Sequence, residues 1–308
     1  MSIASKHVCI LMGIKNGESY LGEQLQSIQA QTHRNWSLVA SDDGSSDRSV
    51  DVVRQFVNSC GSPVAIRSGP RAGFSANFMS LARSKDWHAD YFAFSDQDDI
   101  WYADKLDRAV RRLESISQDI PAIYCSRTEL VDGDGRHIGF SPLFRKPPSF
   151  QHALVQNIAS GNTMVFNRNA KRLFETTPDI EVNSHDWWGY QLVSGVGGIV
   201  FYDPEPTMKY RQHGRNAVGL ETTLWSRWGR VRAIFAGGLS AMMDLNVQAL
   251  QASRAHLTNK SQMVLDDFAA ARDAQFATRL YKLWKSGVYR QTLPATYTLW
   301  LAAMTRKL

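Results

Sequence analysis

The chain has 308 residues, of which 44% are hydrophobic and 21% are charged, and its formal net charge is +6. This balance is typical of a globular protein and allows one large domain or one domain with an appendage. No apolar run reaches about 18 residues, and no solenoid repeat or low-complexity tract is visible, which argues against a transmembrane helix and a repeat architecture.

The cysteines and the first residues indicate a cytosolic protein. Cys9, Cys60 and Cys125 are far apart and show no metal-ligand spacing. Cys9 and Cys125 lie in apolar runs and are expected to be buried thiols, as in a reducing compartment. The segment before the first predicted strand, residues 1–6, is short and polar, so we expect no signal peptide. The predicted location is the cytoplasm, at the inner face of the plasma membrane.

Strand and helix patterns alternate four times in the first 120 residues. The predicted strands are residues 8–12, 36–40, 64–66 and 91–94. The predicted helices are residues 20–28, with Ser19 or Asn16 as the cap, a helix after Asp47 with its apolar face over residues 50–57, residues 74–82, and a helix with its apolar face over residues 106–116. This alternation predicts an α/β fold with a parallel, doubly wound sheet.

The pattern changes after Pro121. We expect strands at residues 122–126, 163–166 and 198–202, a hairpin at 131–138 and a helix at 185–193. From Leu224 the pattern is helical, with breaks at residues 237–238, Gly287 and Pro294. The sequence therefore predicts a catalytic-type domain over residues 1–220 and a helical C-terminal region over residues 221–308.

Three carboxylates follow the apolar run at residues 91–94 within four positions: Asp96, Asp98 and Asp99. They lie at the carboxyl end of a predicted strand, where open α/β sheets bind ligands. Like charges so close repel one another unless a cation lies among them. The spacing of Asp96 and Asp98 allows both to contact one divalent ion. The alternative is that Asp99 or Asp104 caps the next helix.

A second acidic loop, with Asp42 and Asp43, follows the second predicted strand. Both loops would lie along one edge of the sheet. One division of labour is that the first loop recognises a base or ribose and the second holds Mg²⁺ or Mn²⁺ on a diphosphate. No phosphate-binding Gly-rich loop follows the first strand, so a nucleotide would be held through the metal. The alternative for Asp42 and Asp43 is an Asx turn with a helix cap.

Two further clusters could carry chemistry. Asp186 stands between His185 and a Trp pair, and an acid beside large aromatics can be partly desolvated and suited to accept a proton. The alternative is an N-cap. Arg211, His213 and Arg215 alternate, so on an extended segment they would meet a diphosphate, and His213 could ligate a metal. The alternative is a solvated basic loop.

Taken together, these motifs resemble family 2 glycosyltransferases of the GT-A fold. The opening of the chain carries the first part of this resemblance, through Asn16-Gly17, Tyr20-Leu21, Glu23-Gln24-Leu25, Gln31-Thr32 and residues 41–47. Further motifs resemble the bacterial rhamnosyltransferase-like branch in particular. They are residues 96–101, Asp104-Lys105-Leu106, Gly73, Asn77-Phe78, residues 161–164, His185-Asp186 and residues 210–216. The resemblance covers about the first 220 residues, and five separated motifs occur in the family's order.

The resemblance implies an inverting, metal-dependent transfer of a sugar from a nucleotide-diphosphate sugar, with dTDP-rhamnose as the expected donor. The expected cofactor is Mg²⁺ or Mn²⁺, and the acceptor is a saccharide or lipid-linked saccharide of a bacterial surface polysaccharide. By position, Asp186 is the general base. The metal site is Asp96, Asp98 and His213, with Asp98 the closer ligand. The nucleotide-sugar residues are Asn16, Asp42, Asp43, Arg71, Asn77, Asp96, Arg211 and His213.

One departure concerns the loop after the first strand, where Ile14-Lys15 replaces the family's usual Thr-Tyr or similar pair. Lys15 near a donor phosphate or base edge would alter donor choice.

The C-terminal region interleaves aromatic and basic residues at 225–235 and 280–285. Such stretches can lie in a membrane interface, and the alternative is a set of helices that pack on the catalytic domain with a solvated basic face. We expect no nucleic-acid partner because no such motif is present. Two other functions compete with a transferase: a sugar-phosphate nucleotidyltransferase, and a non-catalytic sugar-nucleotide-binding or scaffold subunit.

Overall fold

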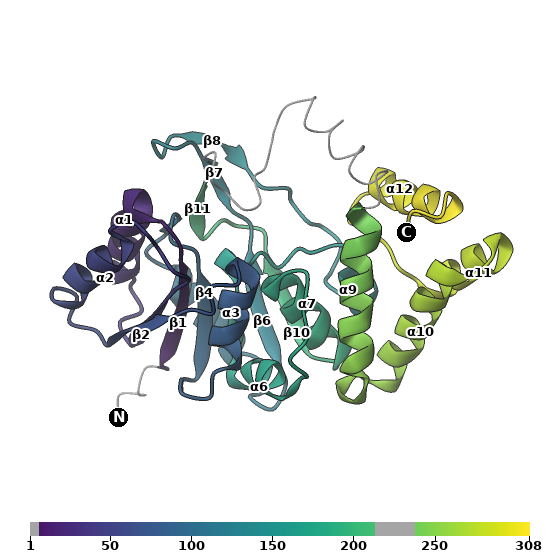
Figure 1. Cartoon of the computed structure of the whole chain (residues 1–308), viewed down its shortest axis with the longest axis horizontal. Helices are drawn as coiled ribbons and strands as arrows, with labels where there is room; N and C mark the ends of the chain where they lie inside the picture. The colour runs from purple at the N-terminus through teal and green to yellow at the C-terminus, as the bar shows by residue number, and fades with distance from the viewer. Residues whose placement is uncertain (1–5, 213–237) are drawn as a thin grey trace. The chain divides into compact units, whose positions relative to one another are not determined.

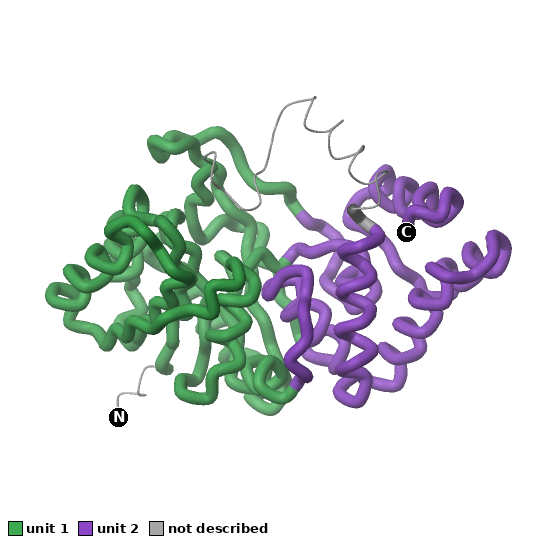
Figure 2. Tube along the Cα trace, in the orientation of Figure 1, with its two compact units in different colours: residues 1–143, 159–176, 199–213 green, residues 144–158, 177–198, 214–308 purple. Residues whose placement is uncertain are grey.

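The computed structural model describes residues 6–212 and 238–308 (Figure 1). His213, Arg215 and the aromatic stretch at 225–235 lie outside the described residues. The chain forms two compact units, shown in green and purple in Figure 2. Unit 1 comprises residues 1–143, 159–176 and 199–213, and unit 2 comprises residues 144–158, 177–198 and 214–308.

Unit 1 is built on a seven-stranded sheet with the order β10-β6-β9-β4-β1-β2-β3. The strands are β1 (Val8–Ile14), β2 (Trp36–Asp42), β3 (Val64–Ser68), β4 (Tyr91–Ser95), β6 (Ala122–Ser126), β9 (Val165–Asn167) and β10 (Ile199–Asp203). All neighbours pair in parallel except β9, which runs antiparallel to β4 and β6. The expected α/β fold with a mostly parallel sheet is confirmed.

The helices of unit 1 include the four predicted ones, in the predicted order, and two that were not predicted, at residues 161–163 and 168–176. They are α1 (Glu18–Gln29), α2 (Ser49–Val57), α3 (Phe74–Arg83), α4 (Lys105–Glu114) and α6 (Arg168–Thr176), together with the short 3₁₀ helix η1 (Gly161–Thr163). The predicted caps of the first helix are wrong. α1 begins after Gly17, so Ser19 lies inside its first turn, and Asn16 instead accepts a hydrogen bond from the backbone of Ser46 at 2.8 Å.

Aromatic side chains fill the core beside the central strand β4. The ring of Phe94 lies 4.9 Å from that of Phe166 and 5.5 Å from that of Phe78, measured between centroids. The ring of Phe174 lies 5.5 Å from that of Phe166. Such tilted and edge-on contacts add to the free energy of apolar burial. They hold β4, and therefore the acidic loop that follows it, in a fixed position.

A second, four-stranded sheet of unit 1 has the order β5-β11-β7-β8. Its strands are β5 (Ile100–Trp101), β7 (Glu129–Val131), β8 (His137–Phe140) and β11 (Met208–Arg211). The predicted hairpin is the β7–β8 pair, whereas β5 and β11 are not predicted. The strand predicted at residues 163–166 begins two residues later, because Gly161–Thr163 forms η1.

Unit 2 is helical. Its helices are α5 (Phe150–Ala153), α7 (His185–Gly195), α9 (Gly238–Ala252), the short 3₁₀ helix η2 (Arg254–His256), α10 (Asn259–Asp273), α11 (Phe276–Ser286) and α12 (Leu293–Met304). Gly287 ends α11 in the left-handed conformation, as predicted. Pro294 is not a break, because it lies in the first turn of α12, where proline is tolerated.

The units are not separated at one point along the chain. Residues 144–158 and 177–198 group with the C-terminal helices. The functional division at residue 220 stays a prediction. Among residues 6–212 and 238–308, no helix has the length and apolar character needed to cross a bilayer.

Candidate active site

The carboxyl ends of three parallel strands of unit 1 meet at one edge of the sheet. In the strand register, Ile14 at the end of β1 lies beside Asp42 at the end of β2, and Met12 lies beside Ser95 at the end of β4. The loops that follow these strands therefore gather at one place. They include both acidic loops found in the sequence.

The densest group of acids follows β4. Asp96, Asp98 and Asp99 each place one carboxylate oxygen within 4.8 Å of the others. Asp96 and Asp98 are half-buried, and Asp99 is fully buried. Among the described residues the Oδ1 atom of Asp99 has no hydrogen-bond partner. Hard carboxylate oxygens at this spacing suit Mg²⁺ or Mn²⁺, so the residues present fit a divalent cation.

A network of buried polar groups supports Asp99. Its Oδ2 atom accepts a hydrogen bond of 2.9 Å from the side-chain amide of Asn162. Lys105 donates to the backbone oxygen of Asn162 at 2.6 Å, and its ammonium lies 4.5 Å from the centre of the Trp101 ring. Burial raises the pKa of Asp99, and the neighbouring carboxylates add to this. Burial also lowers the pKa of Lys105 to about 7.

The alternative that the acids only cap a helix is wrong. Asp99 lies six residues before the start of α4 and bonds Asn162 instead. Asp104 occupies the N-cap position of α4 but makes no side-chain cap bond. The sequence did not single out Asp99 as a metal ligand, although its place beside Asp98 was a usable signal.

The acids of the first loop are engaged by backbone groups. The carboxylate of Asp43 accepts hydrogen bonds from the backbone N–H of Arg71 at 2.6 Å and of Gly73 at 3.0 Å. Asp42 accepts one from the N–H of Ser45 at 3.1 Å, which is the Asx turn considered above. The two bonds to Asp43 join the loops after β2 and β3.

Gln97 and Lys15 link the two acidic loops, and the sequence did not reveal this link. The Gln97 side chain accepts from the Lys15 N–H at 2.8 Å and donates to the Lys15 carbonyl at 2.9 Å. The Lys15 ammonium donates to the backbone oxygens of Asp43 at 2.8 Å and Gly44 at 2.6 Å. A Cβ on Gly17 would lie 2.3 Å from the Gln97 Oε1 atom, so a larger residue at position 17 would require the Gln97 side chain to move.

Two predicted nucleotide-binding residues have different surroundings. Asn77 is buried, and its amide group accepts from the Ser41 hydroxyl at 2.6 Å and donates to the Ser41 carbonyl at 2.9 Å. Asn77 therefore supports the end of β2. Arg71 is exposed, has a positive φ of 59°, and packs its side chain beside Gly44. Arg71 therefore lies on the surface of the loop that Asp43 organises.

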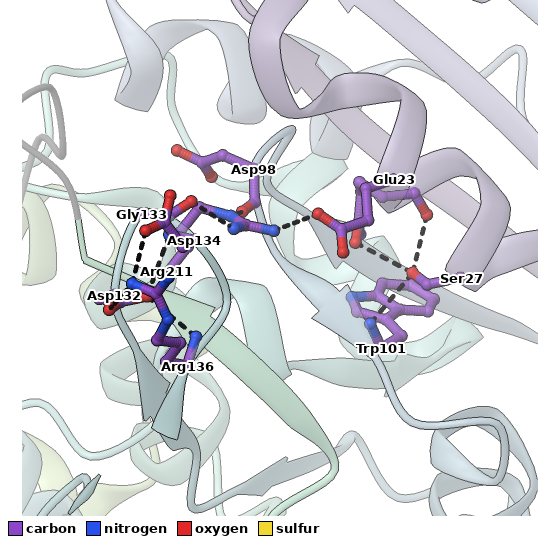
Figure 3. Close-up of polar contacts among 10 residues, drawn as sticks. Glu23, Ser27, Asp98, Trp101, Asp132, Gly133, Asp134, Arg136 and Arg211 are labelled. Atoms are coloured by element: carbon purple, nitrogen blue, oxygen red, sulfur yellow. Dashed lines mark hydrogen bonds and ion pairs between the residues drawn. The ribbon is translucent and has the colours of Figure 1, made fainter. Parts of the chain in front are cut away.

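Arg211, predicted to meet a diphosphate, is buried at the end of β11 (Figure 3). Its guanidinium donates to the backbone oxygens of Asp98 at 3.1 Å and Gly133 at 2.8 Å, and it forms an ion pair with Glu23. It also lies 4.8 Å from the centre of the Tyr20 ring. Arg211 thus connects the acidic loop after β4 to α1 and to the β7–β8 turn.

Asp186, the predicted base, belongs to unit 2 and lies in the first turn of α7. One carboxylate oxygen accepts from the N–H of Trp187 at 2.7 Å, and the other accepts from the side-chain amide of Asn157 at 3.0 Å. The N-cap position of α7 is held by Ser184, so Asp186 is not the cap residue. Burial lowers the pKa of its neighbour His185 to about 4, which keeps that imidazole neutral near pH 7.

Comparison with known proteins decides the family. The sequence profile described as "Glycosyl transferase family 2" matches residues 9–174. The dTDP-rhamnosyl transferase RfbG of Shigella flexneri is 31% identical over 232 residues, covering 71% of this chain and 78% of the relative. The chain belongs to glycosyltransferase family 2.

Another relative of this family 2 chain is an Escherichia coli protein named UDP-Glc:alpha-D-GlcNAc-diphosphoundecaprenol beta-1,3-glucosyltransferase WfgD. It is 32% identical over 103 residues, covering 33% of this chain and 39% of the relative.

Solved structures agree on the fold. S. aureus TarS (residues 1–349) in complex with UDP-GlcNAc aligns with a TM-score of 0.58 at 11% identity, covering 98% of this chain and 88% of that one. The Pyrobaculum calidifontis mannosyltransferase PcManGT, in complex with GDP-Man and Mn²⁺, aligns with a TM-score of 0.54 at 15% identity, covering 99% and 86%. The predicted GT-A fold, family and glycosyl transfer are confirmed. Family membership decides against the nucleotidyltransferase and scaffold hypotheses.

Proposed function

We propose that this glycosyltransferase moves a sugar from a nucleotide-diphosphate sugar to an acceptor hydroxyl, with inversion and with a divalent cation at Asp96 and Asp98. The observation that carries the proposal is the carboxylate cluster, whose oxygens lie within 4.8 Å of one another at the edge where β1, β2 and β4 end. Ligands of open α/β sheets bind at such an edge. The acids also lie beside a loop that can face a base or ribose.

The donor is proposed to be dTDP-rhamnose. The relative that shares 31% identity over 71% of this chain is named a dTDP-rhamnosyl transferase. Structures with the same fold bind other nucleotide sugars, UDP-GlcNAc and GDP-Man, so the fold by itself does not select the base. We assign the choice of donor to Lys15 in the loop after β1, to Asp42 and Asp43 at the end of β2, and to Arg71.

The acceptor is proposed to be a saccharide carried on a lipid, as in the synthesis of a bacterial surface polysaccharide at the cytoplasmic side of the membrane. The support is the relative WfgD, which is named as a glucosyltransferase acting on a diphosphoundecaprenol-linked GlcNAc.

When bound, the cation would stabilise the negative charge that develops on the leaving diphosphate. Asp96 and Asp98 would hold it, and Asp99 is the third carboxylate within reach. The resemblance adds His213 as a further ligand. Arg211 acts by positioning, because it holds the backbone of Asp98.

Asp186 is proposed to be the general base that accepts the proton of the acceptor hydroxyl. Hydrogen bonds from Asn157 and from the N–H of Trp187 fix the orientation of its carboxylate. With no enzyme carboxylate acting as a nucleophile, a single displacement inverts the anomeric centre. The catalytic domain is proposed to end near residue 220.

A transfer assay with dTDP-rhamnose, UDP-GlcNAc and GDP-Man tests this function on a lipid-linked acceptor. We expect transfer from dTDP-rhamnose, lowered by about 10²–10⁴-fold in Asp186→Asn, because a positioned base contributes a factor of this size. The control is Asp273→Asn, at an exposed carboxylate of unit 2. Full transfer by Asp186→Asn would remove Asp186 from the mechanism, and transfer only from another sugar nucleotide would refute the donor assignment.

A further inference from the structure

The helix α12 of unit 2 presents apolar side chains on two opposite faces. Its buried face consists of Leu299, Ala302 and Ala303, each at most 2% exposed. Its other face carries four large apolar side chains exposed to solvent: Leu293 (64%), Tyr297 (69%), Leu301 (46%) and Met304 (46%). We call these four residues the α12 stripe. Their spacing of four, four and three residues places them in one line along the helix.

No charged side chain accompanies the α12 stripe within its helix. Residues 293–304 contain no charged side chain. The neighbouring helix α11 adds Tyr281 (56% exposed) and Trp284 (68% exposed), whose ring centres lie 6.2 Å apart. Large apolar side chains exposed in this number on neighbouring helices mark a site that is covered by a membrane or a partner.

The charges of the same region favour an anionic occupant. Residues 238–308 contain nine Lys and Arg residues and four Asp residues, with no Glu, a net charge of +5. Neither α11 nor α12 contains an acidic residue, and Arg306 and Lys307 follow the end of α12. Three of the four Asp residues are in ion pairs, including Asp267 with Lys282 and Lys285. The positive charge is therefore only partly neutralised within the unit.

We propose that the α12 stripe and the exposed rings of α11 dock unit 2 onto the surface of an anionic lipid bilayer. Tyr and Trp side chains favour the boundary between water and lipid, and basic residues beside them bind anionic headgroups. The helix would lie in the interface and would not cross it, since 12 residues span only about 18 Å. The proposal rests on the proposed function and deepens it, because a docked enzyme would bind its lipid-carried acceptor at the bilayer surface where that acceptor lies.

The test is co-sedimentation of the full chain with vesicles, in the absence of nucleotide and acceptor. We expect binding to vesicles that contain phosphatidylglycerol, weaker binding to pure phosphatidylcholine, and a decrease at high salt. The variant Tyr297→Gln/Leu301→Gln should lose binding by about tenfold or more, because two apolar side chains no longer enter the interface. The control Ile66→Gln/Ile138→Gln removes exposed apolar side chains from unit 1 and should bind as the wild type does.

Three outcomes would overturn the proposal. The first is a wild-type protein that does not bind vesicles containing phosphatidylglycerol. The second is a stripe variant that binds them as well as the control does. The third is a stripe variant whose native mass falls to that of a smaller oligomer while its vesicle binding is unchanged, which would make the α12 stripe a subunit interface. Because no sugar nucleotide is present, failure of the proposed donor or metal site would leave these results unchanged.

Discussion

The side-chain amide of Asn162 donates a 2.9 Å hydrogen bond to the buried carboxylate of Asp99, directly behind the acids proposed to hold the metal. The same residue accepts the ammonium of Lys105 through its backbone oxygen. Asn162 thus connects the two buried ionisable groups of the site. The motif around Asn162 in the sequence therefore has a structural reason, which is to satisfy an acid that burial would otherwise destabilise.

Asn162→Ala removes the bond to Asp99 and the 2.8 Å bond that the Ser160 hydroxyl donates to the Asn162 Oδ1 atom, whereas the backbone bond to Lys105 remains. We expect the free energy of unfolding to fall by about 2 kcal/mol, since a buried acceptor is left without its donor. Urea denaturation measures this. Asn58→Ala, at an exposed position after α2, should change stability by less than about 0.5 kcal/mol. Equal stability of the two variants would mean that the hydrogen bond between Asn162 and Asp99 does not stabilise the fold.

Figure 3 shows both Arg211 and Arg136, which have different environments. Arg211 is buried and bonds Asp98, whereas Arg136 is 74% exposed and pairs with Asp134 on the surface. Arg211→Met should lower the free energy of unfolding by about 2 kcal/mol or more and weaken metal-dependent nucleotide binding, since three backbone and side-chain acceptors lose their donor. Arg136→Met should cost less than about 1 kcal/mol. If nucleotide binding by Arg211→Met matched that of Arg136→Met, the positioning role would be wrong.

Gly17 and Gln97 are predicted to act as one unit. A Cβ at residue 17 would displace the Gln97 amide and break its two bonds to Lys15. Gly17→Ala and Gln97→Ala should therefore each weaken donor binding by about fivefold, which corresponds to roughly 1 kcal/mol in total for the two solvent-accessible bonds. The double variant should be little worse than either single one. Isothermal titration calorimetry with the nucleotide measures the binding free energies of the wild type, both single variants and the double variant. Fully additive losses would show that the two residues act independently.

The buried imidazole of His152 should make stability depend on pH. It contacts the Tyr190 hydroxyl at 3.0 Å and Gln156 at 3.3 Å, and burial lowers its pKa to about 4, from 6.5 in the unfolded chain. The unfolded state therefore binds more protons between these two values, and stability is lost as the pH falls through this window. From about pH 7 to about pH 5 the loss from this residue should be about 2 kcal/mol.

His152→Gln isolates this contribution. The variant should show a smaller loss of stability between the two pH values in urea titrations, whatever its stability at neutral pH. His88→Gln, at an exposed position, should keep the wild-type pH dependence. An unchanged slope in His152→Gln would mean that His152 does not titrate differently in the folded and unfolded states.

Much of the fold was predictable because its signals are local. Apolar runs fix β1, β2 and β4, and acids that directly follow two of these strands indicate the edge where the site lies. β5 and β11 escaped prediction because they are short and pair only with each other or with β7, across about 100 residues of sequence. Pairing at that distance leaves no periodic pattern.

The roles of individual site residues were less predictable for a related reason. Asn77 and Arg211 were expected to face the nucleotide, but in the structure their polar groups are bonded to Ser41, Glu23 and the backbone of Asp98. Glu23 and Arg211 are 188 residues apart in the sequence. A motif identifies residues that belong to the site, whereas burial and partners decide whether they contact the ligand or hold another residue.

The central claim is that Asp98 holds a cation on which donor binding depends. The direct measurement is the thermal unfolding midpoint of the wild type, Asp98→Asn and Asp51→Asn, each with dTDP and with or without Mn²⁺. Asp51 is an exposed acid of α2 and serves as the control. At about 100 times the Kd, a ligand of the folded state should raise the midpoint by about 5 °C. We predict this rise for the wild type and Asp51→Asn only when Mn²⁺ is present, and no rise for Asp98→Asn. The same rise in Asp98→Asn, or in the wild type without metal, would contradict the account.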